Sequence, residues 1–209
     1  MVERSFMMAK SDRAYPADVH AESGFRLPLP KREDLAEDAR RLYDRAVDPK
    51  SGSIKGLRGP GGIKLYSPKV SEYGQPLTRY LRWESGFDGR IRELAILVTA
   101  READSVFEWQ AHEPEALKEG VPQATIDIIK HRRPTAGLAE PDKIIIDLGR
   151  EIFVARKVAP QTFARAQKQF GAKALVDLVS LMGNYAGTAA LLCAFGMEIE
   201  PGDQQLLPL

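Results

Sequence analysis

The stretch between Asp88 and Gly120 combines the most apolar helical pattern of the chain with a carboxylate. From Ile91 to Ala100 nearly every residue is apolar or small, which predicts a helix that is hydrophobic around most of its circumference and is therefore buried. Glu93 interrupts this run. Because an unpaired carboxylate is costly to remove from water, we expect Glu93 to be paired, shifted in its pKa or used in chemistry.

A second helix is predicted to start after a short break at residues 103–105. On this helix Glu108 and His112 stand four residues apart, so they share one face. If the two helices form an antiparallel hairpin, Glu93 comes opposite that face, and two carboxylates and an imidazole converge. Ser105 and Glu108 also match the capping-box pattern, which satisfies free N–H groups at a helix start, so a structural role for Glu108 stays open.

No metal site is expected around His112. His112 and Glu113 begin the zinc-protease pattern H-E-x-x-H, but position 116 holds Ala, so the second histidine ligand is missing. A single histidine on a helix is more often structural than catalytic, and the pattern alone leaves that interpretation of His112 open.

The N-terminal part of the chain has two irregular segments around one charged helix. Residues 1–30 contain prolines and glycines without any periodicity and are expected to form an arm. Apolar residues then recur at helical spacing from Lys31 to Val47. The glycine-rich segment 49–68 is predicted to be a long loop that serves as the lid or rim of a pocket.

Helices are also predicted on both sides of the central pair. One begins at Pro68, is expected to split at Gly74 and Pro76, and places Tyr80 and Trp83 in the core. The others cover residues 122–130, a segment that begins at Pro141, residues 160–171 and residues 172–195.

The last helix repeats part of the pattern of the central one. At a constant offset of 84 residues, the positions of Ile91, Glu93, Leu94 and Leu97 are matched by Leu175, Asp177, Leu178 and Leu181. This echo indicates an internal duplication. No segment shows the sustained alternation that is typical of a strand, so we predict an all-α fold of about seven to nine helices, in a single domain that spans residues 31–209.

Composition excludes several classes of partner. The 30 basic and 29 acidic residues are interspersed and give a formal net charge of +1, so the footprint of a nucleic-acid-binding protein is missing. The longest apolar run, within residues 186–195, is shorter than the ~20 residues needed to span a bilayer, so we expect no membrane partner and a cytoplasmic protein. The one cysteine, Cys193, lies in an apolar helix, which predicts a buried and unreactive thiol.

The central helices also carry a resemblance. The run Arg92-Glu93-Leu94-Ala95-Ile96-Leu97, followed by Glu108-Trp109 and His112, resembles the carboxymuconolactone decarboxylase family, whose superfamily contains alkyl hydroperoxidase D. The resemblance spans residues 40–201. In the peroxidase branch a Cys-x-x-Cys pair precedes the histidine, and those two positions here hold Ser105 and Glu108, while a second histidine position holds Phe107. The chain is thus more similar to the branch without thiols, whose members read Glu-Trp-x-x-His.

The resemblance implies an alkyl hydroperoxidase D-like helical bundle that forms homo-oligomers, often trimers or hexamers, and needs no cofactor. It also implies a lyase that acts by acid–base chemistry on a small organic acid or lactone from aromatic degradation, by decarboxylation or a related carbon-acid reaction. In such a reaction His112 supplies a proton, Glu93 orients the imidazole or donates a proton itself, and Glu108 sets the charge of the pair. Trp109 and Tyr185 are expected to form walls of the substrate pocket.

Two alternatives to this enzyme stay open. One is an alkyl hydroperoxidase-like antioxidant protein, which the missing cysteine pair argues against. The other is a non-catalytic binding protein on the same fold, and isomerases or hydrolases could use the same three residues. We expect Glu93→Gln to lose activity, and to gain stability if burial strains the carboxylate.

Overall fold

Helices and helical turns form all the regular structure in residues 14–51 and 53–209, which are the residues that the computed structural model describes. Two 3₁₀ turns, η1 (Arg32–Asp34) and η2 (Lys64–Tyr66), and two π-helical turns, η3 (Tyr80–Glu84) and η4 (Glu151–Ala155), accompany the α-helices. The all-α prediction is confirmed, while residues 1–13 of the predicted arm lie outside the described part of the chain. The α-helices are α1 (Glu37–Val47), α2 (Pro60–Ile63), α3 (Pro68–Arg79), α4 (Gly89–Glu102), α5 (Val106–Lys118), α6 (Gln123–Lys130), α7 (Glu140–Arg150) and α8 (Pro160–Ala194).

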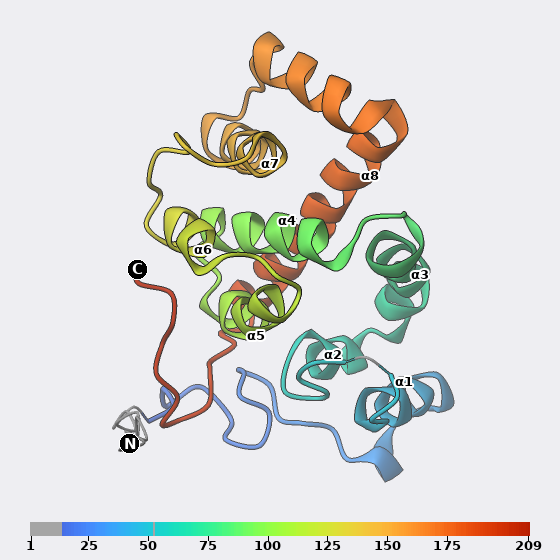
Figure 1. The fold of residues 1–209 in the computed structure, drawn as a ribbon. Helices are drawn as coiled ribbons and strands as arrows, with labels where there is room; N and C mark the ends of the chain where they lie inside the picture. The colour runs from blue at the N-terminus through green and yellow to red at the C-terminus, as the bar shows by residue number, and fades with distance from the viewer. Residues whose placement is uncertain (1–13, 52) are drawn as a thin grey trace, which may run out of the picture.

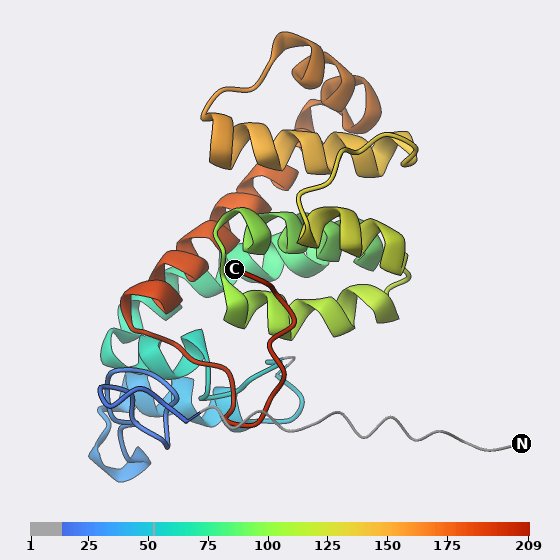
Figure 2. The same ribbon diagram turned by 90° about the vertical axis from the view of Figure 1, so that its left-hand side faces the viewer.

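Helix α4 forms the centre of the molecule. It packs against α5, α7 and α8, and Figure 1 and Figure 2 show it between α7 and α5, with α8 crossing beside it. Every residue from Arg92 to Arg101 is buried, as the apolar pattern predicts. The side chain of Asp88 accepts a hydrogen bond from the Ile91 N–H at 2.8 Å and so caps the N-terminus of this helix.

A tight connection at residues 103–105 joins α4 to α5 in the predicted hairpin. The Ser105 N–H donates to the carbonyl of Ala100 at 2.8 Å. A capping box would need that same N–H for the carboxylate of Glu108, so this prediction is wrong: the Ser105 side chain makes no capping hydrogen bond, and the side chain of Glu108 is buried. The turn geometry therefore frees Glu108 from the structural role that its spacing allowed.

Two hydrophobic clusters hold the helices together. The larger one contains side chains from α4 to α8 together with Leu81 of η3. The smaller one joins both ends of the described chain to α2, α5 and α8, through Phe25, Ile63, Phe107, Leu192 and Ile199. Residues 14–30, predicted as part of a free arm, therefore pack on their own chain, and the Arg26 N–H donates to the carbonyl of Phe195 at 2.8 Å.

The segment before α4 is more helical than the sequence pattern indicated. The predicted loop 49–68 contains the short helices α2 and η2. Helix α3 does not split, because its backbone stays helical through Gly74 and Pro76 and continues directly into the π-helical turn η3. A π-helical turn inside a helix is often found at functional sites.

Trp83 on η3 is 58% exposed, so its predicted place in the core is wrong. Its ring contacts two guanidinium groups, those of Arg92 at 4.4 Å and Arg82 at 4.8 Å. Cation–π contacts of this kind stabilise an aromatic side chain at the surface without burial. Tyr80, by contrast, packs against the larger hydrophobic cluster, as predicted.

Helix α8 joins the two predicted helices 160–171 and 172–195 across a kink at Gly171, whose φ is +75°. Among the described residues it is the one helix whose length and composition would allow it to cross a membrane, although core helices of soluble proteins pass the same test. Near its end Leu192 faces the core and Cys193 faces outward, so the predicted burial of Cys193 is wrong. The four echoed positions, Leu175, Asp177, Leu178 and Leu181, are all buried, and the duplication stays a prediction.

Candidate active site

A buried pair of Glu93 and His112 lies between α4 and α5. Oxygen Oε2 of Glu93 is 2.7 Å from Nδ1 of His112, and the two residues are 1% and 4% exposed. Glu93 comes from the buried face of α4, and His112 from the second turn of α5. The hairpin therefore brings together the two residues that the sequence placed on facing helices.

Glu108 and Tyr185 approach the other side of the imidazole. Oxygen Oε2 of Glu108 is 3.6 Å from Nε2 of His112, a distance that favours ion pairing over a direct hydrogen bond. The ring of Tyr185, from α8, stands edge-on to the imidazole, with the centroids 5.2 Å apart and an interplanar angle of 85°. His112 thus lies between two carboxylates, with an aromatic wall beside it.

Burial and charge move the pKa values of the two carboxylates in opposite directions. Burial alone would raise the pKa of Glu93, but the hydrogen bond and charge of His112, the hydrogen bond from Arg92 and the charge of Arg82 together lower it. Burial raises the pKa of Glu108, and the charges of His112, Arg82 and Lys64 offset this only in part. Glu93 is therefore the carboxylate and Glu108 the better proton donor.

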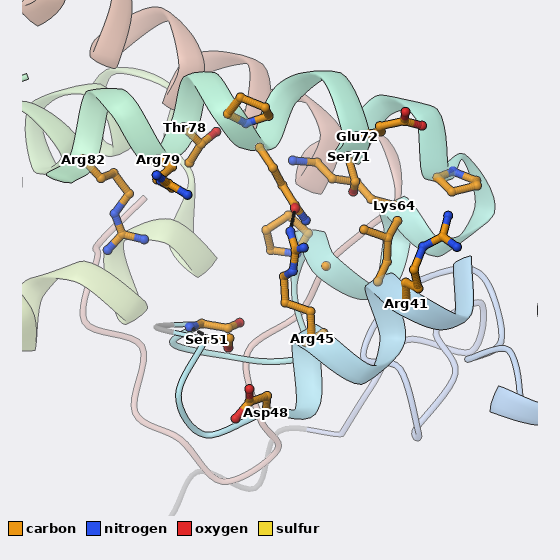
Figure 3. A pocket seen from close by; sticks show the side chains of 18 of the residues that line it. Arg41, Arg45, Asp48, Ser51, Lys64, Ser71, Glu72, Thr78, Arg79 and Arg82 are labelled. Carbon is orange, nitrogen blue, oxygen red and sulfur yellow. Dashed lines mark hydrogen bonds between the residues drawn. The ribbon is translucent and has the colours of Figure 1, made fainter. Parts of the chain in front are cut away.

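A large cavity, with a volume of about 1080 Å³, lies among the N-terminal helices, and Glu93, Glu108, His112 and Tyr185 are not part of its lining. It is lined by residues of α1, α2 and α3, by Asp48, Ser51 and Ser53, by Lys64 of η2, and by Arg82, Trp83 and Glu84 of η3. Figure 3 shows the labelled cationic side chains around it, with Arg82 at one end. Residues of the predicted pocket rim, such as Ser51 and Gly61, are among its lining. Arg82 and Lys64 line this cavity, and the charges of both act on Glu108.

Comparison with known proteins identifies the segment that carries most of this site. A sequence model described as the carboxymuconolactone decarboxylase family matches residues 68–140, which run from α3 to the start of α7. The matched segment is similar to a carboxymuconolactone decarboxylase family domain. Glu93, Glu108 and His112 lie within it, as does Arg82, whereas Tyr185 and Lys64 lie outside the matched segment. Neither the curated proteins nor the solved structures contain a match to this chain.

Arg92 contacts the candidate site, although the sequence pattern did not single it out. Its Nε donates to Oε1 of Glu93 at 3.1 Å, so the Glu93 carboxylate is held from both sides. The same guanidinium donates to the carbonyl of Arg82 at 3.2 Å and to Oε1 of Glu119 at 3.3 Å. The sequence contained a signal for Arg92, since it is a basic residue next to Glu93 in a run that is predicted to be buried. A buried carboxylate needs a cationic partner.

Trp109 lies on α5 in the core of the domain. It is fully buried, its Nε1–H donates to Oε2 of Glu113, and the ammonium group of Lys130 lies 5.8 Å from its ring centre. Lys130 also pairs with Glu113 at 2.8 Å. These contacts give Trp109 a packing role, so we leave it out of the proposed reaction, whereas Tyr185 lies against His112 and its place in a pocket wall stays a prediction.

Metal ligands are sparse in the described chain. Among residues 14–51 and 53–209, no group of three His, Cys, Asp or Glu side chains is arranged to hold a metal ion. The arrangement of His112 between Glu93 and Glu108 is one that acid–base chemistry can use directly.

Proposed function

We propose that the protein is a cofactor-independent enzyme that moves protons to and from carbon in a small organic acid or lactone. The observation that carries the proposal is the buried Glu93–His112 pair with Glu108 on the Nε2 side of the imidazole. A family domain of carboxymuconolactone decarboxylases supports a lyase of the decarboxylating kind. Aromatic degradation is the source of substrate that the family name favours.

The pair assigns the proton positions on the imidazole. Because the pKa of Glu93 is lowered, its carboxylate is ionised and accepts the proton of His112 Nδ1–H at 2.7 Å. In the neutral imidazole Nε2 then carries the free lone pair, and Nε2 is the atom that faces Glu108. Glu93 acts as a positioning residue, since it fixes the tautomer and stabilises the imidazolium form when Nε2 takes a proton.

A decarboxylation at this site needs one proton and no redox partner. The C–C bond to the carboxylate breaks, CO₂ leaves, and the electron pair stays on a carbon that is conjugated to a carbonyl group. Glu108, whose pKa is raised by burial, or the His112 imidazolium then delivers a proton to that carbon. Tyr185 forms an apolar edge beside the imidazole.

The proposal is tested with a panel of lactone and keto acids, measuring CO₂ release and the incorporation of deuterium into the product in D₂O. We expect His112→Ala to lower the rate by about 10²–10⁴-fold, the usual contribution of a general acid–base group. Glu113→Gln is the matched control, because Glu113 is a buried carboxylate on the same helix that binds Lys130 and Trp109 instead of His112. Equal turnover by the wild type and His112→Ala would overturn the proposal.

The two alternative functions give different results in the same experiments. A thiol peroxidase needs a second cysteine to regenerate its thiol, and the chain has only Cys193, which is exposed on α8. A non-catalytic binding protein would bind members of the panel without releasing CO₂ or exchanging deuterium. Such a result, together with an affinity that His112→Ala leaves unchanged, would favour a non-catalytic binding protein over the proposed enzyme.

A further inference from the structure

Arg82 is a cation without a carboxylate partner at the wall of the cavity. Among the described residues its side chain has no hydrogen-bond or ion-pair partner, and its Nε atom is buried without an acceptor. Other cavity-lining arginines are occupied: Arg41 pairs with Glu37 at 2.6 Å, Arg79 pairs with Glu84 at 2.6 Å, and Arg45 donates to Gln75. A buried N–H donor without an acceptor is rare in proteins and calls for one.

The guanidinium of Arg82 is held in place from its own turn. It lies 4.8 Å from the ring centre of Trp83, whose ring also contacts Arg92 at 4.4 Å. Arg92 in turn donates to the carbonyl of Arg82 at 3.2 Å and to the carboxylate of Glu93 at 3.1 Å. The π-helical turn η3 therefore connects Arg82 to the candidate active site through a chain of direct contacts.

The charge of Arg82 also reaches the groups around the imidazole. It contributes to the lowered pKa of Glu93 and works against burial, which raises the pKa values of Glu108 and Tyr185; the three residues lie on three different helices. Figure 3 shows the guanidinium extending from η3 into the space that the cavity-lining elements surround.

We propose that Arg82 binds a carboxylate of the substrate at the wall of the cavity and so directs the reacting carbon toward Glu108 and His112. A guanidinium binds a carboxylate through two parallel hydrogen bonds, which fixes orientation as well as affinity. The carboxylate at Arg82 is one that stays on the product, because an ion pair to the departing carboxylate would stabilise the ground state against loss of CO₂. The placement of a reacting carbon rests on the proposed function, whereas the binding of a carboxylate at Arg82 does not.

Binding of a simple carboxylate probe tests this assignment without turnover. Succinate and its uncharged analogue succinamide are titrated calorimetrically at pH 7 and constant ionic strength into the wild type, Arg82→Met and Arg82→Lys. We expect succinate to bind the wild type, Arg82→Met to weaken it about tenfold or more, and Arg82→Lys to recover only part of the affinity, since an ammonium lacks the planar fork. Arg41→Met is the matched control, because Arg41 lines the same cavity but already pairs with Glu37.

Several outcomes would overturn the proposal. These are equal affinities of succinate for the wild type and Arg82→Met, equal binding of succinamide, no binding of succinate to the wild type, or an equal loss of affinity in Arg41→Met. Inorganic phosphate that binds more tightly than succinate and is lost in Arg82→Met would replace the carboxylate by a phosphate group. Urea unfolding of each variant shows whether the fold is retained, and Arg82→Lys supplies the comparison if Arg82→Met is unstable.

The failure of this inference is distinguishable from the failure of the proposed function. His112→Ala is expected to bind succinate as the wild type does, because His112 is not part of the carboxylate subsite. If the acid panel gives no turnover while Arg82→Met still weakens succinate binding, the carboxylate subsite is supported and the proposed reaction is wrong. If His112→Ala abolishes turnover while Arg82→Met changes neither succinate binding nor KM, the subsite alone falls.

Discussion

Replacing Glu93 by glutamine removes one negative charge from the centre of the site. The carboxylate now accepts from Nδ1 of His112 at 2.7 Å and from Nε of Arg92 at 3.1 Å, and all three side chains are buried. A glutamine keeps one acceptor oxygen and turns the other into an NH₂ donor. It can therefore accept from His112 or from Arg92, but it presents N–H groups to the other donor.

The size of the effect follows from these two contacts. Losing a hydrogen bond to a charged group costs about 1.5–3 kcal/mol, and leaving a buried donor unsatisfied costs about 1–3 kcal/mol. Arg92 keeps Glu119 and the carbonyl of Arg82 as partners, which favours the low end of the sum. We expect Glu93→Gln to lose about 3 kcal/mol of unfolding free energy and, for a domain of this size, about 6–12 °C in Tm. Because the carboxylate is paired, the gain in stability that strain would give is not expected.

Urea unfolding followed by circular dichroism measures this difference, and its pH dependence tests the cause. In the folded protein the contacts of Glu93 hold its pKa below 4.5, which is the ordinary value for the unfolded chain. Its contribution to the free energy of unfolding is therefore complete at pH values above 4.5. The contribution is lost as the pH falls through the lower pKa of the folded state. The wild type and Glu93→Gln should therefore differ fully at pH 7 and converge in acid.

Glu113→Gln is the control for the loss of any buried carboxylate on these helices. Glu113 binds Lys130 and Trp109, so its replacement should also lower stability but should leave turnover of the acid panel close to that of the wild type. Glu93→Gln should lower both. An unchanged stability of Glu93→Gln, or a stability difference that is the same at pH 7 and in acid, would refute the pairing on which this reasoning depends.

Three further predictions concern the other parts of the site and the surface. Glu108→Gln should lose turnover, yet at pH 8 it should unfold at a higher urea concentration than the wild type, a difference that should be absent in acid. Burial raises the pKa of Glu108, so its ionisation opposes folding once the pH rises above the pKa that it has in the unfolded chain. A variant that is less stable than the wild type at pH 8 would contradict this. Cys193 should react rapidly with a thiol reagent, while peroxide turnover should be absent from the wild type; a peroxide activity that Cys193→Ser abolishes would contradict it. The protein should be a homo-oligomer larger than a dimer, with α8, whose Val176 and Val179 are exposed, in or near the interface, whereas α4, the other candidate from its apolar pattern, is buried within the chain; a 23.2 kDa monomer by light scattering at micromolar concentration would exclude that assembly.

Helical periodicity was enough to predict the central part of the site. Glu108 and His112 share a face by their spacing of four residues, and a break of three residues leaves little choice but a hairpin with the helix of Glu93. The structure brings these residues together as that reasoning expects. The role of Ser105 could not be predicted in the same way, because its N–H is used by the carbonyl of Ala100 in a tight turn that depends on a positive φ at Asp104.

Burial was harder to predict where a side chain has two ways to be stabilised. Trp83 was expected in the core because burial is the usual use of an aromatic ring, yet two guanidinium groups stabilise it at the surface. Cys193 lies in a run that is apolar on every side, so the sequence does not distinguish it from the neighbouring Leu192, which faces the core. Periodicity identifies the buried face of a helix only where a polar face exists to contrast with it.

The opposite pKa shifts of Glu93 and Glu108 depend on residues that are far apart in the sequence. Glu93 and Glu108 are the same residue type, and both are almost fully buried. Glu93 receives two direct hydrogen bonds, from His112 and Arg92, whereas Glu108 is influenced by charges at a distance, so burial is offset in one and not in the other. Arg82 and Lys64, which contribute to that difference from η3 and η2, are 26 and 44 residues from Glu108 in the sequence, and only the tertiary fold brings their charges to it. Two carboxylates that are equivalent in the sequence thus have pKa values shifted in opposite directions in the fold.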